Sequence, residues 1–127
     1  MPATHLLIYR DEDDVPLATW FRELNARNRP AAAKCIALIG LLESFGSELR
    51  RPRADYLSDG VYELRTEVRG VNYRILYGFV GKNVALLSHG LTKEGKIKAK
   101  EIDLAVARLE RVRNDPDRFT ASVEELR

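Results

Sequence analysis

Residues 61–92 read VYELRTEVRGVNYRILYGFVGKNVALLSHGLT and contain three β-prone runs. In the first two runs apolar and polar side chains alternate, with the period of two that is typical of a strand. Arg69-Gly70 and Gly81-Lys82 separate the runs, and each pair contains a glycine that can take the positive φ of a tight hairpin turn. We therefore expect three consecutive antiparallel strands, over residues 61–68, 72–80 and 83–89.

Two-residue turns at these positions fix which side chains lie opposite each other. The first turn places Arg65 opposite Arg74, and the second places Arg74 opposite His89. The register therefore predicts a row of two arginines and a histidine across three strands, on one face of the sheet. The other face is expected to carry the core, made of Leu64, Ile75, Tyr77, Phe79, Val84 and Leu86.

The segments around these strands complete an α+β fold. Residues 5–9 are apolar and β-prone, and apolar side chains recur at helical spacing over residues 17–24, 35–45 and 102–112. The expected order is strand, helix, helix, strand, strand, strand, helix. Strands grouped apart from helices indicate a small antiparallel sheet, with the two N-terminal helices on one face and a C-terminal helix.

Two segments carry no regular pattern. Residues 47–60 are polar, contain Pro52 and end in turn-forming residues, so we expect a loop. The acidic tail after Phe119 is expected to be only weakly ordered.

Length and composition limit the class of protein. A chain of 127 residues, 45% hydrophobic and 31% charged, is expected to form one domain over residues 1–127. Its single cysteine, Cys35, excludes a disulfide framework and a cysteine-based zinc site, and lies on a helical stripe as a small core residue. No apolar run approaches the roughly 18 residues of a membrane span, and the N-terminus does not resemble a signal peptide. We expect a cytoplasmic protein without a cofactor or metal.

The net charge of +2 is unevenly distributed along the chain. Residues 47–100 carry 11 basic and six acidic side chains, a net charge of +5, whereas the flanking segments are weakly acidic. We expect the middle of the chain to face phosphates or an acidic protein surface. A solvated basic surface is the alternative on charge alone.

The row of Arg65, Arg74 and His89 has two interpretations. Like charges directly opposite each other destabilise a sheet, so the row indicates an anion site whose guanidinium groups bind a phosphate. His89 would then supply a side chain that can transfer protons near neutral pH. In the alternative, Glu63 and Glu67 on the same face neutralise the arginines in a purely structural network.

A basic loop follows the strand that carries His89. Its lysines, Lys93, Lys96 and Lys98, can contact a nucleic-acid backbone or stabilise a transition-state phosphate. For any single lysine of this loop, a solvated surface is the alternative.

Ordered short motifs run through the second half of the chain. They are Tyr62-Glu63-Leu64-Arg65, Tyr73-Arg74-Ile75-Leu76-Tyr77, Ala85-Leu86-Leu87-Ser88-His89-Gly90-Leu91-Thr92-Lys93, Glu101-Ile102 with Ala105, and Asn114-Asp115-Pro116. As an ordered set at these spacings, they resemble the phage-Gp49-like, HigB-type branch of the RelE/ParE toxin superfamily.

The resemblance implies a small cytoplasmic α+β toxin of a type II toxin–antitoxin pair, encoded by a bacterium or phage. Members of the family typically cleave mRNA, usually on the ribosome, and are silenced by a helix-turn-helix antitoxin. Arg65, Arg74 and Lys93 fall where the family keeps basic residues. The expected catalytic residues are Arg65, Arg74, His89 and Lys93, and the expected RNA-binding residues are Lys96, Lys98, Arg50 and Arg51.

Two other functions stay open. Some toxins of the superfamily bind DNA gyrase and catalyse nothing, and an inactivated toxin would act only as an antitoxin-binding module. His89 favours an enzyme, because it is a candidate for acid–base chemistry. We therefore expect a metal-independent mRNA endoribonuclease that inhibits translation, with the ribosome, mRNA and a helix-turn-helix antitoxin as partners.

Overall fold

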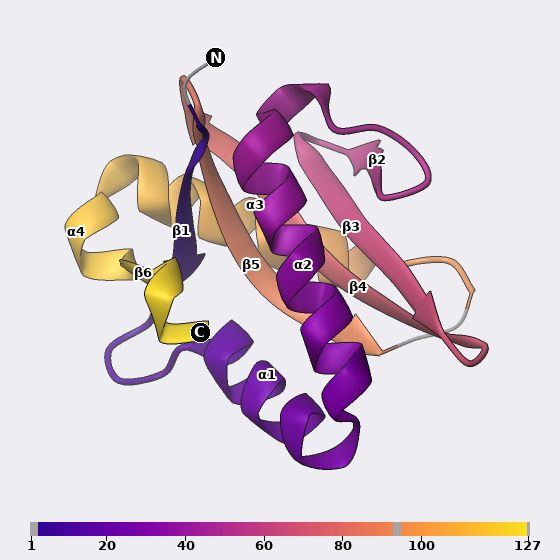
Figure 1. The fold of residues 1–127 in the computed structure, drawn as a ribbon. Helices are drawn as coiled ribbons and strands as arrows, with labels where there is room; N and C mark the ends of the chain where they lie inside the picture. The colour runs from indigo at the N-terminus through magenta and orange to yellow at the C-terminus, as the bar shows by residue number, and fades with distance from the viewer. Residues whose placement is uncertain (1–2, 93–94, 127) are drawn as a thin grey trace.

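The chain folds into a six-stranded sheet with helices on both faces (Figure 1). The computed structural model describes residues 3–92 and 95–126. Within these two ranges, no helix has both the length and the apolar character needed to cross a membrane. In chain order the elements are β1 (His5–Tyr9), α1 (Pro16–Arg27), α2 (Arg29–Phe45), the 3-10 turn η1 (Gly46–Glu48), β2 (Ala54–Ser58), β3 (Val61–Val68), β4 (Val71–Gly81), β5 (Val84–Thr92), α3 (Ala99–Asn114), α4 (Pro116–Phe119), β6 (Thr120–Ser122) and the 3-10 turn η2 (Val123–Leu126).

The strands lie in the order β2-β3-β4-β5-β1-β6. Neighbouring strands are antiparallel except β1 and β5, which run parallel with His5 opposite Val84. A parallel pair needs a long crossover connection, and residues 10–83 provide it. The predicted α+β fold is confirmed, with a sheet that is mixed rather than wholly antiparallel.

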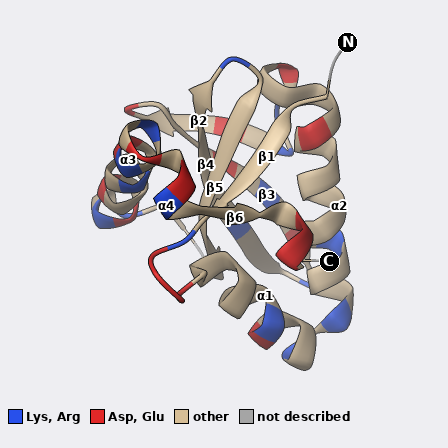
Figure 2. Ribbon diagram, turned by 90° about the vertical axis from the view of Figure 1, so that its left-hand side faces the viewer, with Lys and Arg blue, Asp and Glu red and all other residues tan. Residues whose placement is uncertain are grey.

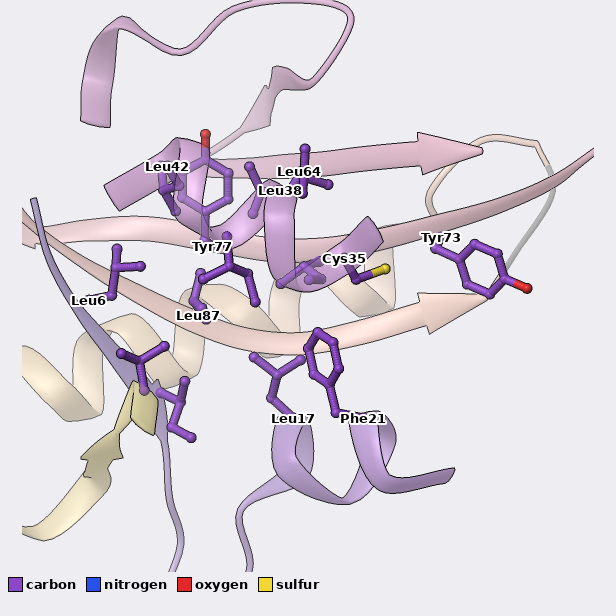
Figure 3. Close-up of a cluster of buried hydrophobic side chains, with 14 of the residues drawn as sticks. Leu6, Leu17, Phe21, Cys35, Leu38, Leu42, Leu64, Tyr73, Tyr77 and Leu87 are labelled. Carbon is purple, nitrogen blue, oxygen red and sulfur yellow. The ribbon is translucent and has the colours of Figure 1, made fainter. Parts of the chain in front are cut away.

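Helices α1 and α2 cover one face of the sheet and α3 covers the other (Figure 1). The larger core lies under α1 and α2, where their apolar side chains meet those of the strands (Figure 3). Cys35 is fully buried there, and burial raises the pKa of its thiol to about 12, so it is a core residue as predicted. The smaller core lies under α3, where Ala105 and Leu109 are buried with Leu76.

The first predicted hairpin has the expected register, but the second does not. β3 and β4 turn at Arg69-Gly70, so Arg65 lies opposite Arg74 as predicted. β4 and β5 turn at Lys82-Asn83, one residue later than expected. The reason is that Asn83 takes the left-handed conformation, with φ of 57°, which asparagine tolerates better than most residues.

The pairing of β4 with β5 also contains two irregularities, one beside the turn and one at Leu76 and Tyr77. Between the two irregularities, each β4 residue lies opposite the β5 residue one position later than expected. A shift of one residue moves the β5 side chains there to the opposite face of the sheet. Leu86 therefore lies in the smaller core under α3, not with Leu64 and Ile75 as predicted. Of the other predicted core residues, Tyr77 is buried in the larger core, Phe79 packs against it, and Val84 is partly buried.

Two segments expected to lack regular structure form strands. Residues 54–58 of the expected loop are β2, which pairs with β3. The tail forms β6 and η2, and it buries Ala121 and Val123 in the larger core. Both strands are short, and their structure depends on pairing with a longer neighbour rather than on their own pattern.

Candidate nucleic-acid interface

A basic pocket lies along the outer edge of β3. The pairing of β2 with β3 ends at Ala54 opposite Leu64, so β3 forms the edge of the sheet from Arg65 onward. The backbone N–H of Arg65 donates to the carbonyl of Arg53 at 2.8 Å, which joins the preceding loop to this edge. The pocket has a volume of about 450 Å³ and is lined by Lys34, Pro52, Arg53, Arg65, Thr66, Glu67 and Asn72.

Three cations from three different elements line this pocket. Lys34 lies on α2, Arg53 on the loop before β2, and Arg65 on β3, and all three are exposed. The ammonium of Lys34 donates to the backbone carbonyl of Glu67 at 3.4 Å, which holds it at the rim. Glu67 is the single carboxylate among the lining residues, so the pocket is electropositive and suits a phosphate.

Arg74 lies directly opposite Arg65 but is buried. Its Nε atom is 3.6 Å from Oε1 of Glu63, and the two side chains are only 8% and 6% exposed. Burial raises the pKa of Glu63, and the charges of Arg74 and Arg65 oppose that shift. For Arg74 the structure therefore shows the ion pair with Glu63 that the sequence left open, whereas Glu67 lies exposed at the basic pocket.

The predicted row of Arg65, Arg74 and His89 is wrong at its third member. Leu91 lies opposite Arg74, and His89 lies opposite Leu76, two residues further along β4. The cause is the turn between β4 and β5, which comes later in the chain than expected. His89 remains on the face covered by α3 but is displaced from the two arginines.

His89 is bonded through both ring nitrogens. Its Nδ1 is 2.8 Å from Oγ of Ser88, and its Nε2 is 3.1 Å from Oε1 of Glu101 in the first turn of α3. A neutral ring protonated at Nε2 satisfies both contacts, because it donates to Glu101 and accepts from Ser88. Burial lowers the pKa of His89 and Arg108 lowers it further, against the opposing effect of Glu101. His89 is therefore neutral at pH 7, and it ties β5 to α3.

The basic loop between β5 and α3 lies at the same end of the sheet as the β3–β4 hairpin (Figure 1). Lys96 and Lys98 are exposed, and between them Ile97 is buried in the smaller core. Ile97 thus fixes the described part of the loop while Lys96 and Lys98 face solvent. Lys93, an expected catalytic residue, lies outside the described residues.

Arg50 and Arg51 lie on the same loop as Arg53 but line a different cavity. Both are exposed. The Nε atom of Arg51 is 3.1 Å from Oδ1 of Asp55, and this hydrogen bond lowers the pKa of that carboxyl. The structure therefore does not bring these two arginines into the pocket of Arg65.

Sequence reasoning did not identify Lys34 or Arg53 as site residues. Arg53 follows Arg50-Arg51-Pro52, and this run of charge was a usable signal. Lys34 is a polar position on an amphipathic helix, a pattern without functional meaning until the fold places it near Arg65. Over the described part of the chain, no group of three or more His, Cys, Asp or Glu side chains is arranged to hold a metal ion.

Comparison with known proteins identifies the family. A search of curated protein sequences finds no match to this chain. The family of phage-derived Gp49-like proteins (DUF891) matches residues 19–110, a range that includes every residue lining the basic pocket. Because this match covers well over half of its length, the chain belongs to the phage-derived Gp49-like family, which is the family of the RelE/HigB-type toxins of toxin–antitoxin systems.

Proposed function

We propose that this protein is the toxin of a type II toxin–antitoxin pair and that it cleaves mRNA on the ribosome without a metal ion. The observation that carries the proposal is the basic pocket of Lys34, Arg53 and Arg65, in a protein of this family. Exposed cations around an open pocket favour binding of the phosphodiester backbone of RNA.

The proposed reaction uses the RNA itself as the nucleophile. The 2′-hydroxyl oxygen attacks the adjacent phosphorus, and the bond between phosphorus and O5′ breaks. A base accepts the 2′ proton, and an acid donates a proton to O5′. The products are a 2′,3′-cyclic phosphate and a free 5′-hydroxyl. Arg65 stabilises the negative charge of the pentacoordinate transition state.

We assign the proton transfers to the loop between β5 and α3. Lys96 is exposed there, and the expected role of Lys93 belongs to the same assignment. His89 supports this loop through Glu101, because its ring is buried and both of its nitrogens already have partners. Arg74 lies opposite Arg65 on the neighbouring strand, where its ion pair with Glu63 stabilises the sheet that carries Arg65. On the ribosome, alignment of the 2′-oxygen with phosphorus would lower the barrier further.

A protein partner is part of the proposal. Toxins of this family act in pairs with an antitoxin. We propose that the antitoxin of this pair is a helix-turn-helix protein and that the toxin works in the cytoplasm, where it meets ribosomes and mRNA. The exposed cations of the basic pocket give an acidic segment of the antitoxin a surface to neutralise.

The burial of His89 favours a second candidate, a gyrase-binding toxin without catalytic activity. In the described residues no histidine lines the basic pocket, so a group suited to proton transfer at neutral pH is not present there. This candidate predicts inhibition of supercoiling by the purified protein and intact mRNA in arrested cells.

Induction of the chain without a partner tests the proposal. We expect growth arrest, with new mRNA ends inside translated regions when RNA is mapped after induction. Arg65→Ala is the matched control, and we expect it to leave the mRNA uncut. Because Arg65 is exposed, this substitution should not unfold the protein. Full-length mRNA persisting while translation stops would contradict the proposal, and inhibited supercoiling in a gyrase assay would support the second candidate.

A further inference from the structure

A second cavity lies at the β2 edge of the sheet, on the other side of the loop that carries Arg53. Its volume is about 340 Å³, within the range of small-ligand sites. The loop separates the two cavities, because Arg51 lines one and Pro52 lines the other. The residues lining this second cavity are Leu49, Arg50, Arg51, Ala54, Asp55, Tyr56 and Tyr62.

Three tyrosines form a row that ends in this cavity. Tyr56, Tyr62 and Tyr77 lie opposite each other on β2, β3 and β4. The rings of Tyr62 and Tyr77 are stacked with centroids 5.4 Å apart, and Tyr56 meets Tyr62 edge to face at 5.0 Å. Tyr77 is buried, whereas Tyr56 is 53% exposed. The row therefore presents an aromatic ring to solvent at the edge of the sheet.

The exposed ring of Tyr56 is held in place on two sides. Its hydroxyl accepts a hydrogen bond from the backbone N–H of Gly60 at 3.1 Å, and Tyr62 packs against the ring. A ring fixed in this way loses little conformational freedom when a ligand stacks on it. Tyr56 is thus a preorganised aromatic surface.

Positive charge accompanies this ring. Arg50 and Arg51 both line the cavity, against the single carboxylate of Asp55. Arg51 is paired with Asp55, while the hydrogen bond that Arg50 donates from Nη1 to the carbonyl of Ser47 uses one of its five N–H donors. A guanidinium that keeps further donors beside an exposed aromatic ring suits a ligand that combines a planar ring with an anion.

We propose that this cavity is a nucleobase subsite for single-stranded RNA, in which a base stacks on Tyr56 and the adjoining phosphate is bound by Arg50. The inference rests on the proposed function and extends it. One RNA strand crossing the loop at residues 51–53 would place a phosphate at Arg65 and an unpaired base at Tyr56. Stacking of this kind tolerates any base, because every base has a π-face.

Binding of short fluorescein-labelled oligoribonucleotides to the purified full chain, measured by anisotropy, tests the subsite. Tyr56→Leu should weaken binding by about 5- to 150-fold, the range that stacking energies correspond to. Tyr56→Phe keeps the ring and should retain most of the affinity. The matched control is Phe45→Leu, because Phe45 is also an exposed aromatic residue, at 54%, but does not line the cavity.

An oligoribonucleotide with one abasic position separates stacking from indirect effects. Moving the abasic position along the strand should reveal one position where the loss of the base weakens binding to the wild type but not to Tyr56→Leu. Equal sensitivity of both proteins at every position would overturn the subsite.

The outcomes also distinguish the subsite from the proposed function. If the wild type and all variants fail to bind RNA, the proposed function fails together with the subsite. If Arg65→Ala weakens binding and Tyr56→Leu does not, only the subsite is overturned. If Tyr56→Leu binds RNA normally but no longer retains a co-expressed antitoxin, the cavity is a protein-docking site and the RNA inference is wrong.

Discussion

Arg65 and Arg74 lie opposite each other on neighbouring strands but have different environments. Arg65 is exposed at the basic pocket, whereas Arg74 is buried beside Glu63. Repulsion between the two guanidinium groups is offset by that carboxylate. One arginine is therefore available to a phosphate, and the other contributes to the stability of the sheet.

We expect Arg74→Ala to lower the free energy of unfolding by about 3–5 kcal/mol, the cost of leaving a buried charge without its partner. Urea denaturation measures this loss. Glu63→Ala should cost a similar amount, because it leaves Arg74 unpaired. The double variant should be less unstable than the sum of the two single variants, and strict additivity would contradict the ion pair.

Arg65→Ala should have the opposite effect, with a loss of activity and little change in stability. We expect cleavage of ribosome-bound mRNA to fall by about 100- to 1,000-fold, since a donor to the transition-state phosphate is lost. The free energy of unfolding should change by no more than about 0.5 kcal/mol, as for other exposed side chains. Single-turnover cleavage and denaturation of the same preparation test both statements, and normal cleavage by this variant would remove Arg65 from the site.

His89 offers a test that separates positioning from proton transfer. A glutamine can place its amide nitrogen near the position of Nε2 and donate to Glu101, but it cannot titrate. We expect His89→Gln to keep most of the cleavage rate and His89→Ala to lose it. Equal loss in both variants, together with a flattened pH–rate profile, would show instead that His89 transfers protons.

The stability of the protein should also depend on His89. Its pKa in the folded state lies below the ordinary value of 6.5, so the unfolded chain binds a proton first as the pH falls. Stability is thus fully present above about pH 6.5 and decreases below it. Thermal melts from pH 7.5 to 5 should show a smaller decrease in His89→Gln than in the wild type.

At the scale of elements, α3 lies close to the sheet because β4 carries a glycine beneath it. A Cβ atom at Gly78 would lie 2.6 Å from Cδ1 of Leu109 and 2.8 Å from the carbonyl oxygen of Gly60. The carbonyl belongs to the backbone and cannot easily move. The distance between α3 and the sheet is thus set by the absence of a side chain at this position.

We expect Gly78→Ala to lower the free energy of unfolding by about 1–3 kcal/mol, because an extra methyl group overpacks this interface. Gly40→Ala is the matched control. Gly40 lies within α2, its Cβ would meet nothing within 4 Å, and alanine there should stabilise the helix by up to about 1 kcal/mol. Denaturation curves that shift in the same direction for both variants would contradict this account.

The elements also show which parts of the fold could be predicted from the sequence and why the other parts could not. The β3–β4 register was predictable because Arg69-Gly70 is the favourable turn between the two alternating runs. At the next turn both Gly81 and Asn83 can take a left-handed conformation, so two registers were open. The two irregularities in the β4–β5 pairing could not be predicted from the sequence, and β2 and β6 depend on pairing with β3 and β1.

The candidate site was predictable to a similar extent. The exposure of Arg65 agrees with its alternating position on a strand. The burial of Arg74 could not be predicted, because it depends on how this side chain packs beside Glu63. Lys34 comes to the basic pocket from another element, 31 residues before Arg65 in the sequence. Site residues of this kind follow from the fold and not from a motif.

At the scale of the whole molecule, the longest run of acidic side chains lies away from the basic pocket. The loop between β1 and α1 carries four consecutive acidic residues, Asp11 to Asp14, and is exposed (Figure 2). It lies on the opposite side of the molecule from the β3–β4 hairpin and from the basic loop between β5 and α3 (Figure 1). The net charge of +2 does not show this polarity between the acidic loop and the basic pocket, which Arg108 and Arg111 offset in part by their interactions with Asp14 and Asp11.

This polarity predicts how RNA binding depends on salt. If Lys34, Arg53 and Arg65 of the basic pocket and Arg50 of the nucleobase subsite each neutralise one phosphate of a single strand, the logarithm of the affinity should fall with the logarithm of salt concentration with a slope of about −3. Arg65→Gln should reduce that slope by about 0.7. Lys82→Gln, in the β4–β5 turn outside the pocket, is the matched control and should leave the slope unchanged.

The position of β1 has a consequence for how the protein is made. β1 is the first strand to be synthesised, yet its two partners, β5 and β6, end at residues 92 and 122. β1 therefore has no neighbour to pair with until the chain has been made through β5, and pairing across so many residues is slow. Strands β2, β3 and β4, which include the edge that carries the basic pocket, are thus complete before β1 has a partner.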